Sequence, residues 1–198
     1  MKLASSHELY AYWSGLRGAR RAPERAEIDP VAIRGVLADT FILGIDQRAG
    51  HPFRIAGART SSLFQRELRG RPFLEIWQNS AQSDVIDMLA IVTDEASPVI
   101  AGVVAKAAGF QPLELELLVL PLRHRGATHS RVIGLCSPAA TPNWLGLAPV
   151  APMCVKSMRV LQEGGDRPGA AEPSQLEGLA RLLRRGHFRF FSLAEPPS

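Results

Sequence analysis

The hydrophobic positions of this chain change their period several times, and each period predicts a different element. Over residues 5–17 they recur every three or four residues, which predicts a helix that opens with a capping box at Ser5 and Glu8. The apolar face of this helix consists of Leu9, Trp13 and Leu16. A second short helix is expected to begin at Asp29 and Pro30, an N-cap residue followed by proline at the first helical position.

From residue 40 onward, runs rich in β-branched and apolar residues are bounded by turn residues, which is typical of strands. The expected strands are 40–46, 52–58, 98–106, 113–122 and 130–136. Three short helical segments separate the first two strands from the last three, at 60–68, 72–77 and 83–95. This order predicts an α+β domain with an antiparallel sheet, one face of which is covered by the central helices.

The expected strand 113–122 is apolar on both of its sides. It begins with strict alternation, in which Glu114 and Glu116 share one face, but residues 117–120 are apolar in succession. A strand that is apolar on both sides is usually covered on both sides, and the central helices cover only one. We therefore expect the N-terminal helix to cover the other face, in the same subunit or in a neighbouring one. The residues expected to make this dimer or sheet-cover contact are Leu9, Trp13, Leu16, Leu118 and Leu120.

The pattern loosens after Pro138, where prolines become frequent and residues 155–161 are a candidate for one additional short strand. A glycine- and proline-rich stretch then has the composition of a linker, and a second capping box predicts a last helix with an aromatic tail. The predicted organisation is an N-terminal helical cap at 1–38, a core domain at 39–138, an extension at 139–162, a linker at 163–173 and a C-terminal helix with tail at 174–198.

Composition excludes several classes of protein. With 46% hydrophobic residues the chain can form a core and is not disordered. A net charge of +4 on 198 residues is weak support for nucleic-acid binding, and none is expected. The two cysteines form neither a disulfide scaffold nor a zinc site. Neither a signal peptide nor a run long enough to cross a bilayer is visible, so we expect a cytoplasmic protein with reduced thiols.

Four blocks of the first two thirds of the chain combine arginine, glycine, proline and aromatic residues. They are Trp13 with Leu16-Arg17-Gly18 and Ile28-Asp29-Pro30, residues 53–57, residues 66–70 with Phe73 and Trp77, and Leu120-Pro121-Leu122. In this order the four blocks resemble a bacterial family of short stand-alone PAS proteins, over about residues 7–138.

The resemblance implies a PAS fold: a five-stranded antiparallel sheet in the order 2-1-5-4-3, helices over one face, and the N-terminal helix on the other. It implies a non-enzymatic sensory or regulatory role in bacterial signal transduction, a homodimer formed through the N-terminal helix, and a signalling protein as partner. A small organic ligand would occupy a cavity between the sheet and the helices. The residues expected to line it are Ile55, Gly57, Leu63, Trp77, Val85, Leu89, Val103 and Leu115.

The residues with reactive side chains favour binding over catalysis. None of the histidines lies on the helix 83–95, where a haem-binding PAS domain would need its axial ligand. Cys136 and Cys154 follow the pocket helices, where a flavin photosensor would need its thiol. Neither haem nor flavin is expected as cofactor, and no metal or catalytic residue is predicted.

Three alternative interpretations of the sequence stay open. The protein can be a pure interaction adaptor with a filled core, or a small-molecule enzyme that uses His124, His129 and Ser130. The arginines between residues 17 and 25 can hold a phosphate or an acidic partner. The favoured interpretation is that they fasten the connector to carboxylates such as Asp29 and Glu24.

Overall fold

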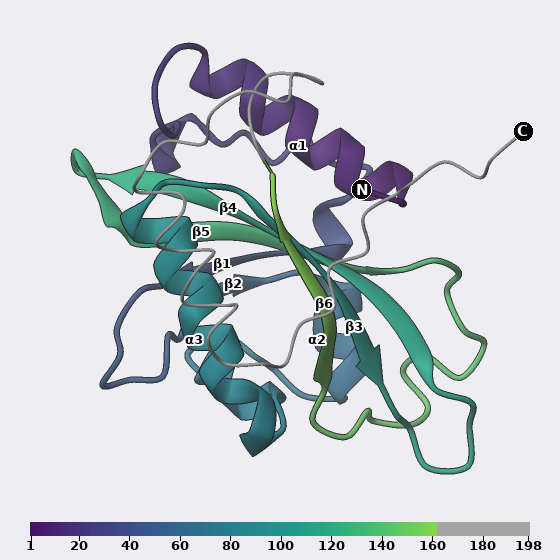
Figure 1. Ribbon diagram of the computed structural model, residues 1–198. Helices are drawn as coiled ribbons and strands as arrows, with labels where there is room; N and C mark the ends of the chain where they lie inside the picture. Colours follow the sequence, from purple (N-terminus) through teal and green to yellow (C-terminus); the bar gives the residue numbers. More distant parts are fainter. Residues whose placement is uncertain (162–198) are drawn as a thin grey trace, which may run out of the picture.

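The predicted strands pair into one antiparallel sheet in this computed structural model, which describes residues 1–161 apart from the side chains of residues 127–129. The strands are β1 (Thr40–Gly44), β2 (Phe53–Ala56), β3 (Val99–Ala105), β4 (Leu113–His124), β5 (Ala127–Pro138) and β6 (Cys154–Val160). They lie in the order β2-β1-β5-β4-β3-β6 (Figure 1). The predicted order of the first five is confirmed. The sheet has six strands and not the five of the implied fold, because β6, which coincides with the candidate additional strand at 155–161, pairs with the free edge of β3.

Three α-helices and three short 3₁₀ helices accompany the sheet. They are α1 (Ala4–Arg17), η1 (Arg25–Glu27), η2 (Leu37–Asp39), α2 (Ala58–Phe64), η3 (Phe73–Ile76) and α3 (Asn79–Asp94). The expected helix 60–68 ends early, because Gln65 adopts a left-handed conformation with φ of 49°. Among the described residues, no helix combines the length and the apolar character needed to cross a membrane.

The helix expected to begin at Asp29 does not form, and residues 30–36 run as successive turns. The Asp29 carboxylate accepts a hydrogen bond from the backbone N–H of Val31, at 2.9 Å. Such a local side-chain bond stabilises a turn in competition with a helix. Ile33 and Val36 are nevertheless buried, so these turns still cover part of the sheet. The predicted linker and the predicted C-terminal helix and tail lie outside the described residues.

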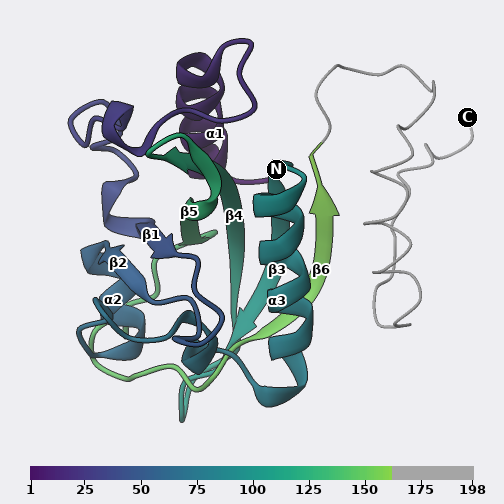
Figure 2. The same ribbon diagram turned by 90° about the vertical axis from the view of Figure 1, so that its left-hand side faces the viewer.

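The sheet separates two hydrophobic cores. The inner core lies between the sheet and α2, η3 and α3, and the outer core lies between the sheet and the N-terminal cap of residues 1–38. Figures 1 and 2 show α1 and α3 packed separately against the sheet. Leu118 and Leu120 of β4 are fully buried in the outer core. The expected cover of the second face is therefore present, and it is provided by the same chain.

Candidate functional site

A stack of four aromatic rings fills the inner core. The ring centroids of Phe41, Phe53 and Phe73 lie 5.5 to 5.8 Å apart, and the Trp77 ring lies 5.6 Å from that of Phe73. Most of these contacts are edge-to-face, which suits the charge distribution of aromatic rings. Gly134 of β5 leaves room for the stack, since a Cβ atom there would stand 2.2 Å from Cζ of Phe41.

Six of the eight residues predicted to line a cavity belong to the inner core. They are Leu63, Trp77, Val85, Leu89, Val103 and Leu115. Each is at most 4% exposed. The structure therefore brings these six together, as side chains within one packed cluster.

The placement of Ile55 in the interior is wrong, because this side chain is 43% exposed. The register between β1 and β2 shifts: Leu43 pairs with Phe53, whereas Ile42 pairs with Ile55 and leaves Arg54 without a partner residue on β1. One extra residue in a strand turns the next side chain to the opposite face of the sheet. Ile55 consequently shares the outer face with Ile42.

Gly57 lies at the junction of β2 and α2, against the backbone of η2. Its N–H donates to the carbonyl oxygen of Thr40 at 2.8 Å. A Cβ atom on Gly57 would stand 2.3 Å from the carbonyl oxygen of Ala38. The space beside Gly57 is therefore occupied by η2, and glycine permits this close approach of two backbone segments.

A small hollow opens on the surface beside the aromatic stack, with a volume of about 260 Å³. Its lining residues are Phe64, Arg66, Glu75, Ile76, Val150 and Pro152. None of the eight predicted residues is among them, although Phe64 and Ile76 are the sequence neighbours of Leu63 and Trp77. The Glu75 carboxylate lies 3.9 Å from the guanidinium groups of both Arg66 and Arg71. The rim of the hollow is thus charged, and its floor is apolar.

The wall of this hollow comes from the extension that follows the core domain. The backbone N–H of Val150 donates to the carbonyl oxygen of Leu63 at 2.8 Å, and the N–H of Met153 donates to the carbonyl oxygen of Ile76 at 2.8 Å. The predicted domain organisation placed this extension outside the core domain of residues 39–138. Trp77 follows directly after Ile76, and its buried indole N–H has no hydrogen-bond acceptor among the described residues. Trp77 itself does not line the hollow, and its indole is an unused donor of the inner core.

A buried carboxyl group lies in η2, directly before β1. Asp39 of η2 accepts hydrogen bonds from the Arg59 guanidinium and from the Ser137 hydroxyl. Burial raises the pKa of Asp39 and outweighs the opposing effects of Arg59 and Ser137. Burial, aided by the charge of Asp39, also raises the pKa of the Cys136 thiol to about 12. This thiol therefore stays protonated and unreactive at neutral pH.

Strand β4 holds α1 on the outer face near both ends of the helix. The Glu116 carboxylate accepts from the backbone N–H groups of Lys2 and Leu3, at 2.7 and 3.1 Å. Near the other end, the indole N–H of Trp13 donates to the carbonyl oxygen of Pro121 at 2.8 Å. Burial opposes ionisation of Glu116, but the Ser6 hydroxyl and the two N–H groups outweigh it and lower the pKa.

The predicted capping box at the start of this helix is wrong. The N-cap residue is Leu3, which has no side-chain cap, and Glu116 from a distant strand binds the N–H of Leu3 instead. The five predicted sheet-cover contacts do meet on the outer face. Leu9, Trp13, Leu118 and Leu120 are fully buried there, and Leu16 is partly buried against them.

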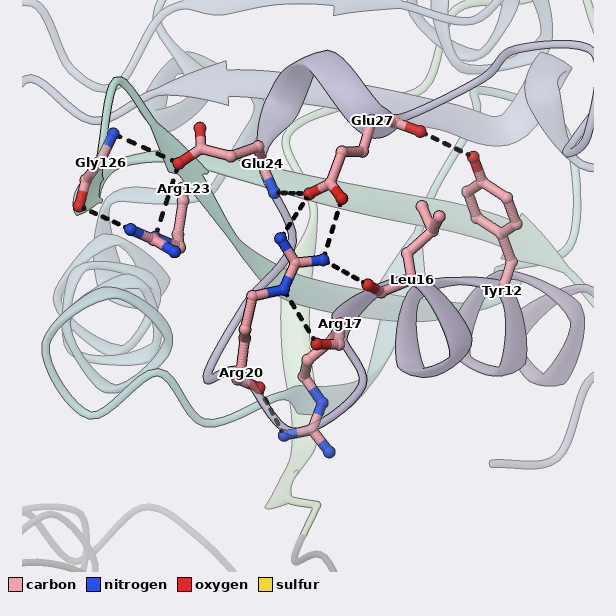
Figure 3. Close-up of polar contacts among 8 residues, drawn as sticks. All are labelled: Tyr12, Leu16, Arg17, Arg20, Glu24, Glu27, Arg123 and Gly126. Atoms are coloured by element: carbon pink, nitrogen blue, oxygen red, sulfur yellow. Dashed lines mark hydrogen bonds and ion pairs between the residues drawn. The ribbon is translucent and has the colours of Figure 1, made fainter.

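The connector after α1 is fastened by the arginines that the sequence analysis singled out (Figure 3). The Arg20 guanidinium donates to both oxygens of Glu27 at 2.9 Å, and the Arg17 guanidinium donates to the carbonyl oxygen of Arg20. Glu24 lies 3.5 Å from Arg123 of β4. The hydrogen bond from Arg20 is the main cause of the lowered pKa of Glu27. Arg17 and Arg20 therefore do fasten the connector. The carboxylate that they use is Glu27, bound by Arg20, in place of the expected Asp29 and Glu24, and Glu24 pairs with Arg123.

An antiparallel sheet in this strand order, with helices enclosing one face and an N-terminal helix on the other, is the architecture of a PAS module. The family model described as PAS domain matches residues 1–137, so the chain belongs to the PAS domain family. Membership of this family indicates a sensory or signalling role. No curated protein matches the chain.

Proposed function

We propose that this chain is a non-enzymatic regulatory protein of bacterial signal transduction that acts in the cytoplasm by binding. A small organic ligand in the inner core would displace the N-terminal cap, and the displaced cap would change the binding of a signalling protein partner. The observation that carries this proposal is the position of β4, whose side chains belong to both cores.

Strand β4 couples the two faces of the sheet. Leu117 and Val119 point into the inner core, while Leu118 and Leu120 lie in the outer core, and none is more than 1% exposed. Close-packed interiors transmit displacements, because they contain little free volume. A shift of β4 that makes room on the inner side therefore moves the surface on which α1 rests. Helix–sheet contacts have a few discrete arrangements, which suits them to report such a shift.

The hollow beside Glu75 is the entrance for the ligand in this proposal. The indole N–H of Trp77, which lacks an acceptor, would donate to an oxygen or nitrogen of the ligand. A hollow of about 260 Å³ is smaller than the roughly 300–1,000 Å³ of pockets for drug-sized ligands. The ligand is therefore either a small metabolite or one that parts the aromatic stack as it enters.

The filled stack favours a second candidate function, an interaction adaptor that takes no ligand. Native mass spectrometry of the freshly purified full chain separates the two candidates. Extra mass that is lost on denaturation supports the ligand-binding protein. The mass of the bare polypeptide supports the adaptor.

Substitution at the hollow tests whether it is the entrance. Val150→Phe fills the space between the extension and η3, and it should abolish co-purification of the small molecule while circular dichroism shows a retained fold. Ile86→Phe is the matched control, because Ile86 is an exposed aliphatic residue of α3 that does not line the hollow. Full occupancy in Val150→Phe would rule out this entrance.

The proposal includes a homodimer as well as the signalling partner. Since Leu118 and Leu120 are buried within one chain, a second copy must contact the exposed surface of the cap or exchange α1 with its neighbour. Removal of residues 1–18 tests this, with light scattering as the measurement. Loss of the dimer supports an interface through α1, and an unchanged dimer removes α1 from the interface.

No chemical step is assigned to the chain in this proposal. The enzyme alternative rests on His124, His129 and Ser130, and the side chain of His129 lies outside the described residues. Turnover on a panel of metabolites, lost in His129→Ala, would favour the enzyme over the binding protein.

A further inference from the structure

Two arginines lie side by side on the outer face of the sheet, near its β2 edge. In the register of β1 with β5, Gly44 pairs with Arg131. Nε of Arg54 stands 2.6 Å from the point that a Cβ atom on Gly44 would occupy. Because Gly44 has no side chain, Arg54 lies across β1 and approaches Arg131. Arg54 is on this face because it directly follows Phe53 of the inner core, and successive side chains of a strand point to opposite faces.

Two more arginines join them from the β4–β5 turn and from η1. The Glu24 carboxylate accepts a hydrogen bond from the N–H of Gly126 in this turn, at 3.3 Å, and Glu24 also contacts Arg123 (Figure 3). Arg25 follows Glu24 and Arg125 precedes Gly126, so this contact fixes the start of η1 beside the turn. The arginine cluster, Arg25, Arg54, Arg125 and Arg131, is thus assembled from four separate segments.

The charge of the arginine cluster is not compensated within the described part of the chain. Neighbouring arginines have carboxylate partners, as Arg20 has Glu27 and Arg123 has Glu24. Within residues 1–161, no carboxylate forms an ion pair with any of the four clustered guanidinium groups. Burial lowers the pKa of Arg131, and the positive charges of the other three lower it further. Four like charges are therefore held close together, and two of the four side chains, Arg25 and Arg131, are half-buried.

We propose that the arginine cluster binds a small anion with two adjacent phosphate groups, such as the diphosphate of a nucleotide. A guanidinium group pairs with phosphate through two parallel hydrogen bonds. One carboxylate would neutralise one arginine, whereas adjacent phosphates bring several negative charges to one point. The cluster is compact and has no recognition helix, which favours a small ligand over nucleic acid. The site is separate from the inner core, so it does not rest on the function proposed above.

Calorimetric titration of the full chain with inorganic pyrophosphate tests the site. The variants Arg54→Gln and Arg131→Gln should each weaken binding at least tenfold, and added salt should weaken binding to the wild type. Arg159→Gln is the matched control, because Arg159 is an exposed arginine on β6, at the opposite edge of the sheet. Absence of binding to the wild type would overturn the proposal, as would equal weakening in the control.

Thermal unfolding separates a binding role from a structural one. Without phosphate and at low salt, Arg131→Gln should unfold no earlier than the wild type, because the substitution relieves repulsion. Pyrophosphate should raise the midpoint of the wild type and leave that of the variant unchanged. A lower midpoint of the phosphate-free variant would show a structural role and overturn the proposal. Tighter binding of single-stranded DNA than of any nucleoside diphosphate would overturn the choice of a small ligand.

Discussion

The absence of a side chain at two positions decides how the sheet is packed. At Gly134 it lets the Phe41 ring lie across β5, and at Gly44 it lets Arg54 lie across β1. Both glycines are in strands, where glycine normally weakens the element. At Gly134 the loss is offset by a ring packed in the inner core, whereas at Gly44 the missing side chain gives room for an arginine beside Arg131.

Gly134→Ala should destabilise the protein by about 1–3 kcal/mol, the usual cost of an overpacked core. The added methyl group would collide with the Phe41 ring, which is held between Phe53 and Phe73. Urea unfolding gives the free energy. Gly15→Ala is the control: it lies in α1 with open space around it and should stabilise the helix by roughly 0.5–1 kcal/mol. Equal stability of Gly134→Ala and the wild type would contradict the packing described.

Asp39 should make the protein less stable as the pH rises. Its pKa is raised by burial above the ordinary value of 3.8, so the folded state holds this proton to higher pH than the unfolded state. The unfolding free energy then falls between pH 3.8 and the raised pKa. Urea unfolding across this range should show a fall in the wild type that Asp39→Asn lacks. An increase attributable to Asp39 would contradict its buried environment.

At the scale of elements, α1 is held by contacts that sequence patterns do not reveal. The period of Leu9, Trp13 and Leu16 predicted the helix and its apolar face. Glu116, which binds the N–H groups of Lys2 and Leu3 just before the helix, is more than 100 residues away in the sequence. Periodicity describes which face of an element is apolar, but not which distant group meets its end. For the same reason the bulge that turns Ile55 outward was not predictable, because a strand pattern does not show the register of its partner.

Glu116→Gln should weaken the docking of α1 and lower stability at neutral pH by about 1 kcal/mol, as for a lost helix cap. Because the pKa of Glu116 is lowered, its contribution is present above the ordinary value of 4.5 and is lost as the pH falls through the lowered pKa. The difference between variant and wild type should therefore shrink in acid. Glu114→Gln, a charge change on the same strand at an exposed position, is the control and should be neutral. A pH-independent difference would contradict a carboxylate cap.

At the scale of the whole molecule, the sheet carries two cores that meet through β4. The periods along the sequence predicted the succession of elements and the two covered faces, because each strand shows the polarity of both of its sides. The order of the strands in the sheet came from the resemblance to the PAS family. It did not predict the hollow, whose wall comes from the extension after residue 138. The six predicted cavity residues are core residues because apolar character marks burial and does not distinguish a packed side chain from one that faces a ligand.

Amide hydrogen exchange of the full chain measures whether the cap moves as a unit on a stable sheet. Local opening has its own free energy, below that of global unfolding. We expect the amides of α1 to exchange through an opening of much lower free energy than those of β4 and β5. Exchange of α1, β4 and β5 at one common free energy would contradict it, since the cap would then leave the sheet only when the whole protein unfolds.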